Sequence, residues 1–337
     1  MRLIRQLACA ALVLASALSA DAAPSRTWTV IALPTLGPYG GGARGINNRG
    51  DVVGTSGVAE YYPHPVLWNH GAAKDLLAGH PAYGVANAIN DQGAVAATEG
   101  SGVIVVKDGV ITPLNIAGEP LDINKSGAVV GYYYPSGQIA SGPMNGFYWK
   151  DGVLRDIGSL GNNQTMAGGV NDKGVVVGYS VLPFSSDSRA IIWENGVLRQ
   201  LQGLGGANSS AGDVTNHGVI LGTAYTPDGI NHMVTWDAVS GLITRDYGPR
   251  LAGYAINDHG TIVGNQLDTG RPFLLEGDTY TWLLELPEMR AQGWLSFGAF
   301  DINERGWIAG IGYREGSTNQ GEPVLLIPEN GGGRPKV

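Results

Sequence analysis

One phrase recurs along this chain, and it constrains the fold more than any other feature. It consists of an apolar residue, an asparagine, a short turn and an apolar run that ends in glycine, as in "YAINDHGTIVG" at residues 254–264. Seven copies align, at residues 44–54, 87–97, 121–131, 168–178, 212–222, 254–264 and 300–310. Neighbouring asparagine positions lie 34 to 47 residues apart, which is the period of solenoid and propeller repeats. The chain is therefore expected to repeat one structural unit.

The residues of the recurring turn explain why the phrase is kept. Glycine occupies the fourth turn position in all seven copies, and asparagine occupies the first in six, with Thr215 in the fifth. An asparagine side chain can accept a hydrogen bond from the backbone two residues on, and glycine adopts the left-handed conformation without a Cβ clash. The pattern predicts a hairpin. It lacks the further ligands and the distal glutamate of a calcium loop, so no metal or cofactor is expected.

Each repeat contains sequence for four strands. After the glycine comes a variable segment and then an apolar run that often ends in tryptophan, as in "RAIIW" at 189–193. A second tight turn follows, such as "ENG" at 195–197, and then a fourth strand. Four antiparallel strands in each of seven repeats predict an all-β fold, a seven-bladed β-propeller. A straight β-solenoid is the alternative. The tryptophans at the shared repeat position are expected to pack between blades: Trp68, Trp149, Trp193 and Trp236.

The two ends of the repeat array are expected to meet. Residues 27–37 resemble a fourth strand without the three that should precede it, and the last repeat supplies three strands and stops near residue 329. Pairing of the N-terminal strand with the last repeat would complete the seventh blade and remove exposed sheet edges. The propeller is therefore expected to span residues 23–329 as a monomer, followed by a disordered tail at 330–337.

The first 22 residues have the composition of a signal peptide. Arg2 and Arg5 precede an apolar stretch, residues 7–18, that is too short for a stable membrane anchor, and cleavage is expected near Ala22. Cys9, the single cysteine, lies in this segment, so disulfides and thiol chemistry are excluded from the remainder. No later stretch predicts membrane insertion. The protein is expected to be secreted or periplasmic.

The charge of the chain limits its partners. The net charge is −8, and no run of basic residues is present. Such a chain is poorly suited to nucleic acid, so a glycan or an envelope or extracellular protein is the expected partner.

The repeat unit as a whole resembles a known family. Residues 189–222 carry its fullest copy: a triplet that starts with a basic residue, a tryptophan, a Leu-Gly-Gly segment and the recurring turn, with Thr215 in place of the asparagine. This unit is similar to the HAF repeat of predicted extracellular bacterial proteins, over essentially all of residues 27–329. The triplets at 64–66, 232–234 and 271–273 each carry substitutions, and the second repeat lacks both triplet and tryptophan. The resemblance implies export and a repeat fold, and it implies no established activity.

One face of the predicted propeller is expected to carry the function. The first-to-second and third-to-fourth turns are uniformly tight, whereas the loops on the opposite face vary, and binding usually resides in loops on a rigid scaffold. Tyrosines end the second strands there, and basic or polar residues start the third strands. Aromatic faces beside planar hydrogen-bond donors suit sugar rings. The candidate ligand-binding residues are His64, Tyr132, Tyr133, Tyr179, Arg189, Tyr225, His232, Arg271, Tyr313 and Arg314.

Three functions fit this face. The first is a secreted module that binds a glycan or a protein. The second is a polysaccharide-active enzyme of the lyase type or a hydrolase, in which Arg189 or Arg271 would neutralise a uronate and Tyr179, Tyr225 or His232 would move a proton. The third is a structural envelope protein. The first two require a Tyr/Arg/His cluster over the central channel, and the third requires these side chains to be scattered or paired with nearby acids.

Overall fold

The computed structural model describes residues 26–59, 62–137, 142–162, 164–316 and 320–329. The expected signal peptide at 1–22 and the expected tail at 330–337 lie outside the described residues. Within them, strands dominate, and the two helices that occur are short: η1 (Leu283–Glu285) and α1 (Pro287–Ala291). The prediction of an all-β fold is confirmed. No helix in the described ranges has the length and apolar character needed to cross a bilayer.

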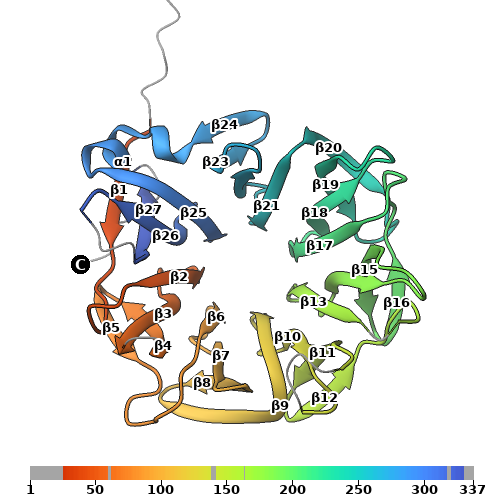
Figure 1. Ribbon diagram of the computed structural model, residues 1–337, viewed down its shortest axis with the longest axis horizontal. Helices are drawn as coiled ribbons and strands as arrows, with labels where there is room; N and C mark the ends of the chain where they lie inside the picture. Colours follow the sequence, from red (N-terminus) through yellow and green to blue (C-terminus); the bar gives the residue numbers. More distant parts are fainter. Residues whose placement is uncertain (1–25, 60–61, 138–141, 163, 317–319, 330–337) are drawn as a thin grey trace, which may run out of the picture.

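The strands form antiparallel sheets that are arranged around a common centre (Figure 1). Four of these sheets contain four strands that follow one another in sequence. Their strands are β2 (Gly41–Ile46), β3 (Val52–Ala59), β4 (Tyr62–Asn69) and β5 (Ala72–Asp75); β13 (Thr165–Val170), β14 (Val176–Val181), β15 (Ser188–Glu194) and β16 (Val197–Gln200); β17 (Ser209–Val214), β18 (Val219–Tyr225), β19 (Asn231–Asp237) and β20 (Ile243–Pro249); and β21 (Leu251–Ile256), β22 (Ile262–Gln266), β23 (Arg271–Glu276) and β24 (Thr279–Trp282). The first strand of each lies nearest the centre.

A fifth four-stranded sheet joins the two ends of the array. It contains β25 (Trp294–Ile302), β26 (Ile308–Arg314), β27 (Glu322–Pro328) and, as its outer strand, β1 (Trp28–Ala32). β1 pairs with β27 in antiparallel register from Trp28 opposite Pro328 to Ala32 opposite Val324. The N-terminal strand therefore completes the sheet of the last repeat, as the sequence predicts.

The second and third repeats differ from the expected pair of separate four-stranded blades, because they form one sheet of seven strands. The strands are β6 (Ala86–Ile89), β7 (Val95–Glu99), β8 (Gly102–Lys107), β9 (Val110–Ile123), β10 (Val129–Tyr133), β11 (Asn145–Lys150) and β12 (Val153–Asp156). The first part of β9 pairs with β8, and the part from Gly118 onward pairs with β10. The reason is the short spacing of 34 residues between Asn90 and Asn124. It leaves no chain for a loop, so one strand runs directly into the next.

The recurring turn has the predicted geometry. In the first repeat, the Gly50 N–H donates to the Asn47 carbonyl, and the Asn47 side-chain oxygen accepts from the backbone N–H groups of Arg49 and Asp51 at 3.0 and 2.9 Å. Gly50 has a φ of 89°, which a residue with a Cβ adopts only with strain. Thr215 makes one bond of this kind, in which its hydroxyl oxygen accepts the Val219 N–H.

The core lies between neighbouring sheets; Trp68, Trp193 and Trp236 are buried in it as predicted, whereas Trp149 is only partly buried. Trp68 is buried with Trp307 and Leu325 of the last repeat, and Trp236 packs against Val177 of the preceding sheet. The indole N–H groups of Trp68 and Trp236 each donate to a backbone carbonyl at 2.7 Å. These side chains hold the sheets together and are not available to a ligand.

Candidate functional site

The inner strands surround two cavities that share lining residues, and we call the space they form the channel. A cavity of about 190 Å³ lies on the side of the asparagine turns, which we call the turn-side mouth. A second cavity of about 120 Å³ lies toward the variable loops, and we call it the loop-side mouth. Asp122, Asp213 and Asp301 line both cavities, so these three carboxylates mark the level at which the two mouths meet.

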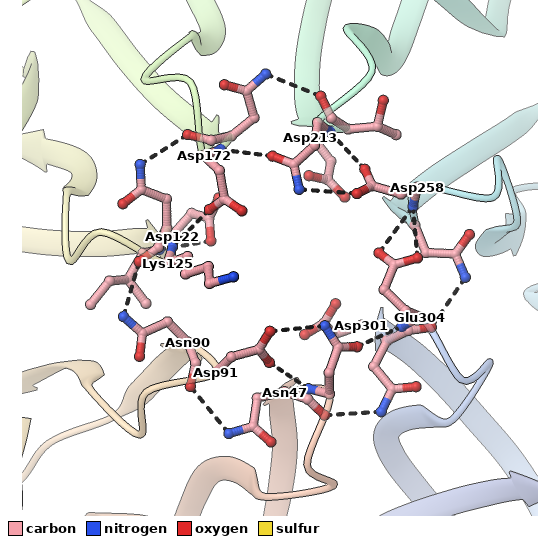
Figure 2. Close-up of a pocket in the computed structure, with 18 of the residues that line it drawn as sticks. Asn47, Asn90, Asp91, Asp122, Lys125, Asp172, Asp213, Asp258, Asp301 and Glu304 are labelled. Carbon is pink, nitrogen blue, oxygen red and sulfur yellow. Dashed lines mark hydrogen bonds between the residues drawn. The ribbon is translucent and has the colours of Figure 1, made fainter. Parts of the chain in front are cut away.

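At the turn-side mouth, the asparagines of neighbouring repeats are joined in series (Figure 2). Each amide donates from its nitrogen to the backbone carbonyl of the next turn, over 2.9 to 3.1 Å. The bonds run from Asn47 to Asn90, Asn124, Asn171 and Thr215, and from Asn257 to Asn303 and back to Asn47. Thr215 has no amide to donate. There, Asn216 contacts both carboxylate oxygens of Asp258, at 2.6 and 3.0 Å.

The residue after each asparagine adds a second layer of contacts. In six of the seven repeats its backbone N–H donates to the side-chain oxygen of the equivalent residue in the next repeat, over 2.6 to 3.2 Å. The exception is Asp91, because the next residue of the series, Lys125, has no side-chain oxygen. The residues at this position are Asn48, Asp91, Lys125, Asp172, Asn216, Asp258 and Glu304. The backbone N–H groups at this mouth therefore need side chains that accept hydrogen bonds, and most of these acceptors are carboxylates. Burial, followed by the charges of Asp258 and Asp91, raises the pKa of Glu304.

The three aspartates at the centre of the channel connect neighbouring inner strands. Each accepts one N–H from its own strand and one from the next, at 2.7 to 2.8 Å. Asp122 reaches Val170, Asp213 reaches Ile256, and Asp301 reaches Ile46. The bonds from Asp213 and Asp301 thus brace β17 to β21 and β25 to β2.

None of the three carboxylates forms an ion pair within the described residues, and the pKa of each is raised. Burial is the main cause, and it raises the pKa of Asp122 and of Asp301 to about 7. The negative charge of Asp213 adds to both shifts, and burial raises the pKa of Asp213 as well. The backbone N–H donors oppose these shifts without cancelling them.

The loop-side mouth combines aromatic and polar walls. Tyr254 and Phe300 lie side by side with ring centroids 6.2 Å apart, and their exposed fractions are 41% and 40%. Tyr254 directly precedes Ala255, and Phe300 directly precedes Asp301. A β-bulge in each of the two inner strands turns both members of the pair toward the channel. Arg44 and Asn87 line the same cavity, and the guanidinium of Arg44 donates to the Asn87 oxygen at 3.4 Å.

A chain of polar contacts leads from this mouth toward the tyrosines that the sequence singled out. The Asn87 amide donates to Glu119 at 3.0 Å, and Glu119 accepts the hydroxyl of Tyr132 at 2.7 Å. Tyr132 contacts Tyr134 edge-on at 5.9 Å. Burial, and then the hydrogen bond to Glu119, raises the pKa of Tyr132, and burial raises that of Tyr179. Both phenols are therefore protonated at neutral pH and are poor bases.

The structure places the predicted basic residues beside local partners and away from the channel. Three repeats share one arrangement, in which the first residue of the basic triplet contacts an acid further along the chain in the same repeat. The pairs are His64 with Asp75 and His232 with Asp246, both at 2.9 Å, and Arg271 with Glu285. Arg271 also lies over the Trp282 ring at 3.9 Å. Arg314 pairs with Glu322 at 2.6 Å, and Arg189 donates to the backbone carbonyls of Ser188 and Ala207.

The remaining predicted tyrosines are separated from one another. Tyr133 donates to Asp156 at 3.0 Å, and its pKa is raised by burial and then by that carboxylate. Tyr225, which ends β18, is half-buried, and Tyr313, in β26, is exposed. None of the ten predicted residues lines either channel mouth.

The channel aspartates were missed by sequence reasoning, although a signal was present. They occupy one aligned position, two residues before the turn asparagine or threonine, in "LDIN", "GDVT" and "FDIN". Tyr254 and Phe300 also share a position, three residues before the asparagine. Comparing repeats column by column would have found both sets. Within the described ranges, no group of three or more His, Cys, Asp or Glu side chains is arranged to hold a metal ion.

Comparisons with known proteins identify the fold. No protein-family model and no curated protein matches the sequence. Among solved structures, a puromycin hydrolase mutant complexed with PGG superposes with a TM-score of 0.55 at 12% identity, covering 82% of this chain and 51% of that one. YCF48 bound to D1 peptide gives 0.49 at 14% identity over 90% and 95% of the two chains. TolB from Acinetobacter baumannii gives 0.45 at 11% identity over 80% and 60%.

The chain is a β-propeller. At these identities the likeness concerns the fold alone. The chain spans about half of the hydrolase and 60% of TolB, so the activities of those proteins do not transfer to it.

Proposed function

We propose that this protein is a secreted or periplasmic seven-bladed β-propeller that binds a macromolecule through its loop-side mouth. In this proposal, the seven-stranded sheet is two blades that share β9, and β1 closes the last blade against β27. The hydrogen bonds that run from Asn47 through the repeats and return from Asn303 support a closed arrangement.

The observation that carries the proposal is the exposed pair of Tyr254 and Phe300 beside the channel. Large aromatic side chains of adjacent repeats stand together, partly exposed, at the rim of a cavity with polar walls. Concave sites with an apolar wall and a few convergent polar groups are typical of ligand binding. A purely structural propeller would have no need to expose two aromatic rings at this place.

Catalysis by the lyase route has less support. That route needs a free base and a free neutralising cation within one sugar unit of each other. Arg271 is paired with Glu285, Arg189 is bound to backbone carbonyls, and His232 is paired with Asp246. The acidic channel would also repel a uronate, so we favour a binding module over an enzyme.

Membership in the HAF-repeat family remains part of the proposal. The pairs His64–Asp75 and His232–Asp246 explain why a histidine and an acid occur at their two positions in that repeat. The histidine lies near the start of the third strand, and the acid also accepts the backbone N–H two residues on, from Leu77 and from Gly248. The pair therefore holds the third strand to the fourth strand of the same repeat, at the end of β5 and within β20.

The test compares two double variants of the full chain. Tyr254→Ala with Phe300→Ala removes the aromatic wall, and Tyr62→Ala with Tyr83→Ala removes two tyrosines of similar exposure, 48% and 49%, that do not line the channel. Glycan arrays and quantitative pull-downs from envelope extract are run on both. We expect ligands retained by the wild type to be lost only with the first variant. Equal retention by both variants would contradict a binding role for the mouth and favour a structural protein.

A further inference from the structure

The chemistry of the loop-side mouth indicates which kind of ligand it accepts. We infer that it receives one cationic side chain, the guanidinium of an arginine or the ammonium of a lysine, from a protein partner. This inference rests on the proposed binding role of the mouth and specifies the ligand.

The aromatic wall is the first observation. Tyr254 and Phe300 are tilted by 38° to each other and belong to neighbouring inner strands, β21 and β25. The faces of such rings attract cations, and arginine and lysine are the side chains that most often occupy them. Elsewhere in this molecule the same contact already occurs, since Arg271 lies 3.9 Å from the Trp282 ring centroid and Arg245 lies 4.4 Å from that of Tyr247.

Charge complementarity is the second, independent observation. Seven carboxylates and two cations, Arg44 and Lys125, line the channel over its two mouths. Lys125 lies at the turn-side mouth, and Arg44 is bound to Asn87 at the loop-side mouth. Asp122, Asp213 and Asp301 line the same cavity as the aromatic pair and have backbone donors and no ion pair within the described ranges. Burial raises the pKa of Asp122 and Asp301 and leaves them partly protonated at neutral pH, so their full negative charge is present only at higher pH. A channel with low-dielectric walls and one dominant sign of charge concentrates counter-ions.

The size of the cavity is the third observation. A volume of about 120 Å³ corresponds to about four water molecules. This room suits the head group of one side chain. The ligand is therefore expected to insert a single extended side chain while the rest of the partner rests on the loop face.

A pair of matched peptides tests the inference. The probe is a fluorescently labelled Gly-Gly-Arg-Gly-Gly peptide with blocked termini, and its partner carries citrulline, which has the same shape without the charge. We expect the arginine peptide to bind the full chain with millimolar or tighter affinity and the citrulline peptide to bind at least about ten-fold more weakly. Binding should weaken as ionic strength rises.

The same aromatic variants locate the site. Tyr254→Ala with Phe300→Ala should weaken binding of the arginine peptide about five-fold or more, whereas Tyr62→Ala with Tyr83→Ala should leave it unchanged. Both variants are checked for a wild-type circular dichroism spectrum. If the aromatic variant binds the peptide as well as the wild type does, the inference is wrong.

Other outcomes separate this inference from the proposed function. Equal binding of both peptides, or aromatic-dependent binding of a neutral oligosaccharide in their place, would overturn the cationic ligand and leave the binding role intact. Tighter binding of free spermidine than of the arginine peptide would overturn the assignment to a protein partner. Absence of peptide binding at millimolar concentration overturns the inference by itself, and the variant pull-downs then decide the proposed function.

Discussion

The carboxylates of the outer strands and those of the inner strands are treated in opposite ways by the fold. Near the rim, Asp75, Asp246 and Glu322 each face a basic side chain of their own repeat. At the centre, Asp122 and Asp301 face backbone N–H groups of the next repeat and no cation of the described chain. At the rim, carboxylates are paired with basic side chains within one repeat, whereas at the centre they accept backbone N–H groups and so join neighbouring repeats.

Breaking the central network should have the largest effect on stability. Asn303 is buried, donates to the Asn47 carbonyl at 2.9 Å, and accepts from the N–H groups of Arg305 and Trp307. Asn303→Ala should lower the free energy of unfolding by about 2–4 kcal/mol, because the Asn47 carbonyl and the Trp307 N–H, both buried, and the part-buried Arg305 N–H lose their bonds. Asn303→Thr is the control. It retains an acceptor as Thr215 does, and urea denaturation should show a loss about 1 kcal/mol smaller. Equal losses would contradict the role of the side-chain acceptor.

The pH dependence of stability should report the central aspartates. The pKa of Asp122 and Asp301 is about 7 in the folded protein and near 4 in the unfolded chain, so the native state binds more protons between these values. The free energy of unfolding should therefore rise as the pH falls from 8 to 5, by on the order of 1–3 kcal/mol.

The control for this pH profile is a pair of variants. Asp122→Asn with Asp301→Asn should flatten the profile between pH 8 and 5, and Glu285→Gln at the rim should preserve it. A wild-type stability that falls steadily over that range would show that these two carboxylates do not carry the effect.

Loss of a rim pair should have a smaller effect. Arg271 and Glu285 are both largely exposed, and such pairs contribute less than about 1 kcal/mol. Arg271→Ala should therefore lower the free energy of unfolding by about 1 kcal/mol or less, including the lost contact with Trp282. Thermal unfolding of this variant beside Glu285→Gln checks the value. If Arg271→Ala lowered the free energy of unfolding as much as Asn303→Ala does, the proposed difference between rim and centre would be wrong.

The smallest expected effect concerns a rim hairpin. His70 has a φ of 48°, and the equivalent positions in three other repeats, Asp108, Asp151 and Asn195, carry the residues that tolerate this conformation best. His70→Asn should stabilise the protein by a few tenths of a kcal/mol. Asn195→His is the reciprocal variant and should destabilise by a similar amount, measured by thermal unfolding in parallel.

Residues that act on their near neighbours could be predicted from the sequence. The asparagine turn depends on bonds from Asn47 to Arg49 and Asp51, which span two and four residues, and the second hairpins depend on positive φ at an aspartate or asparagine followed by glycine. The orphan strand at 27–37 predicted the pairing of β1 with β27, because a sheet edge that lacks a partner and a strand that lacks a sheet fit only one another. These features follow from local backbone chemistry and from strand counting.

Only the tertiary structure decided which side chains meet. The merging of two repeats through β9 depends on where a short linker can run. The convergence of Asp122, Asp213 and Asp301 depends on inner strands that are some 90 residues apart in sequence. The predicted face residues, such as His64 and Arg271, were chosen by residue type. Their partners, Asp75 and Glu285, follow the next hairpin, and the composition does not reveal how that hairpin aligns the side chains. Local turn chemistry is set by neighbours in the chain, whereas a site at a common axis exists only once every repeat has been placed around it.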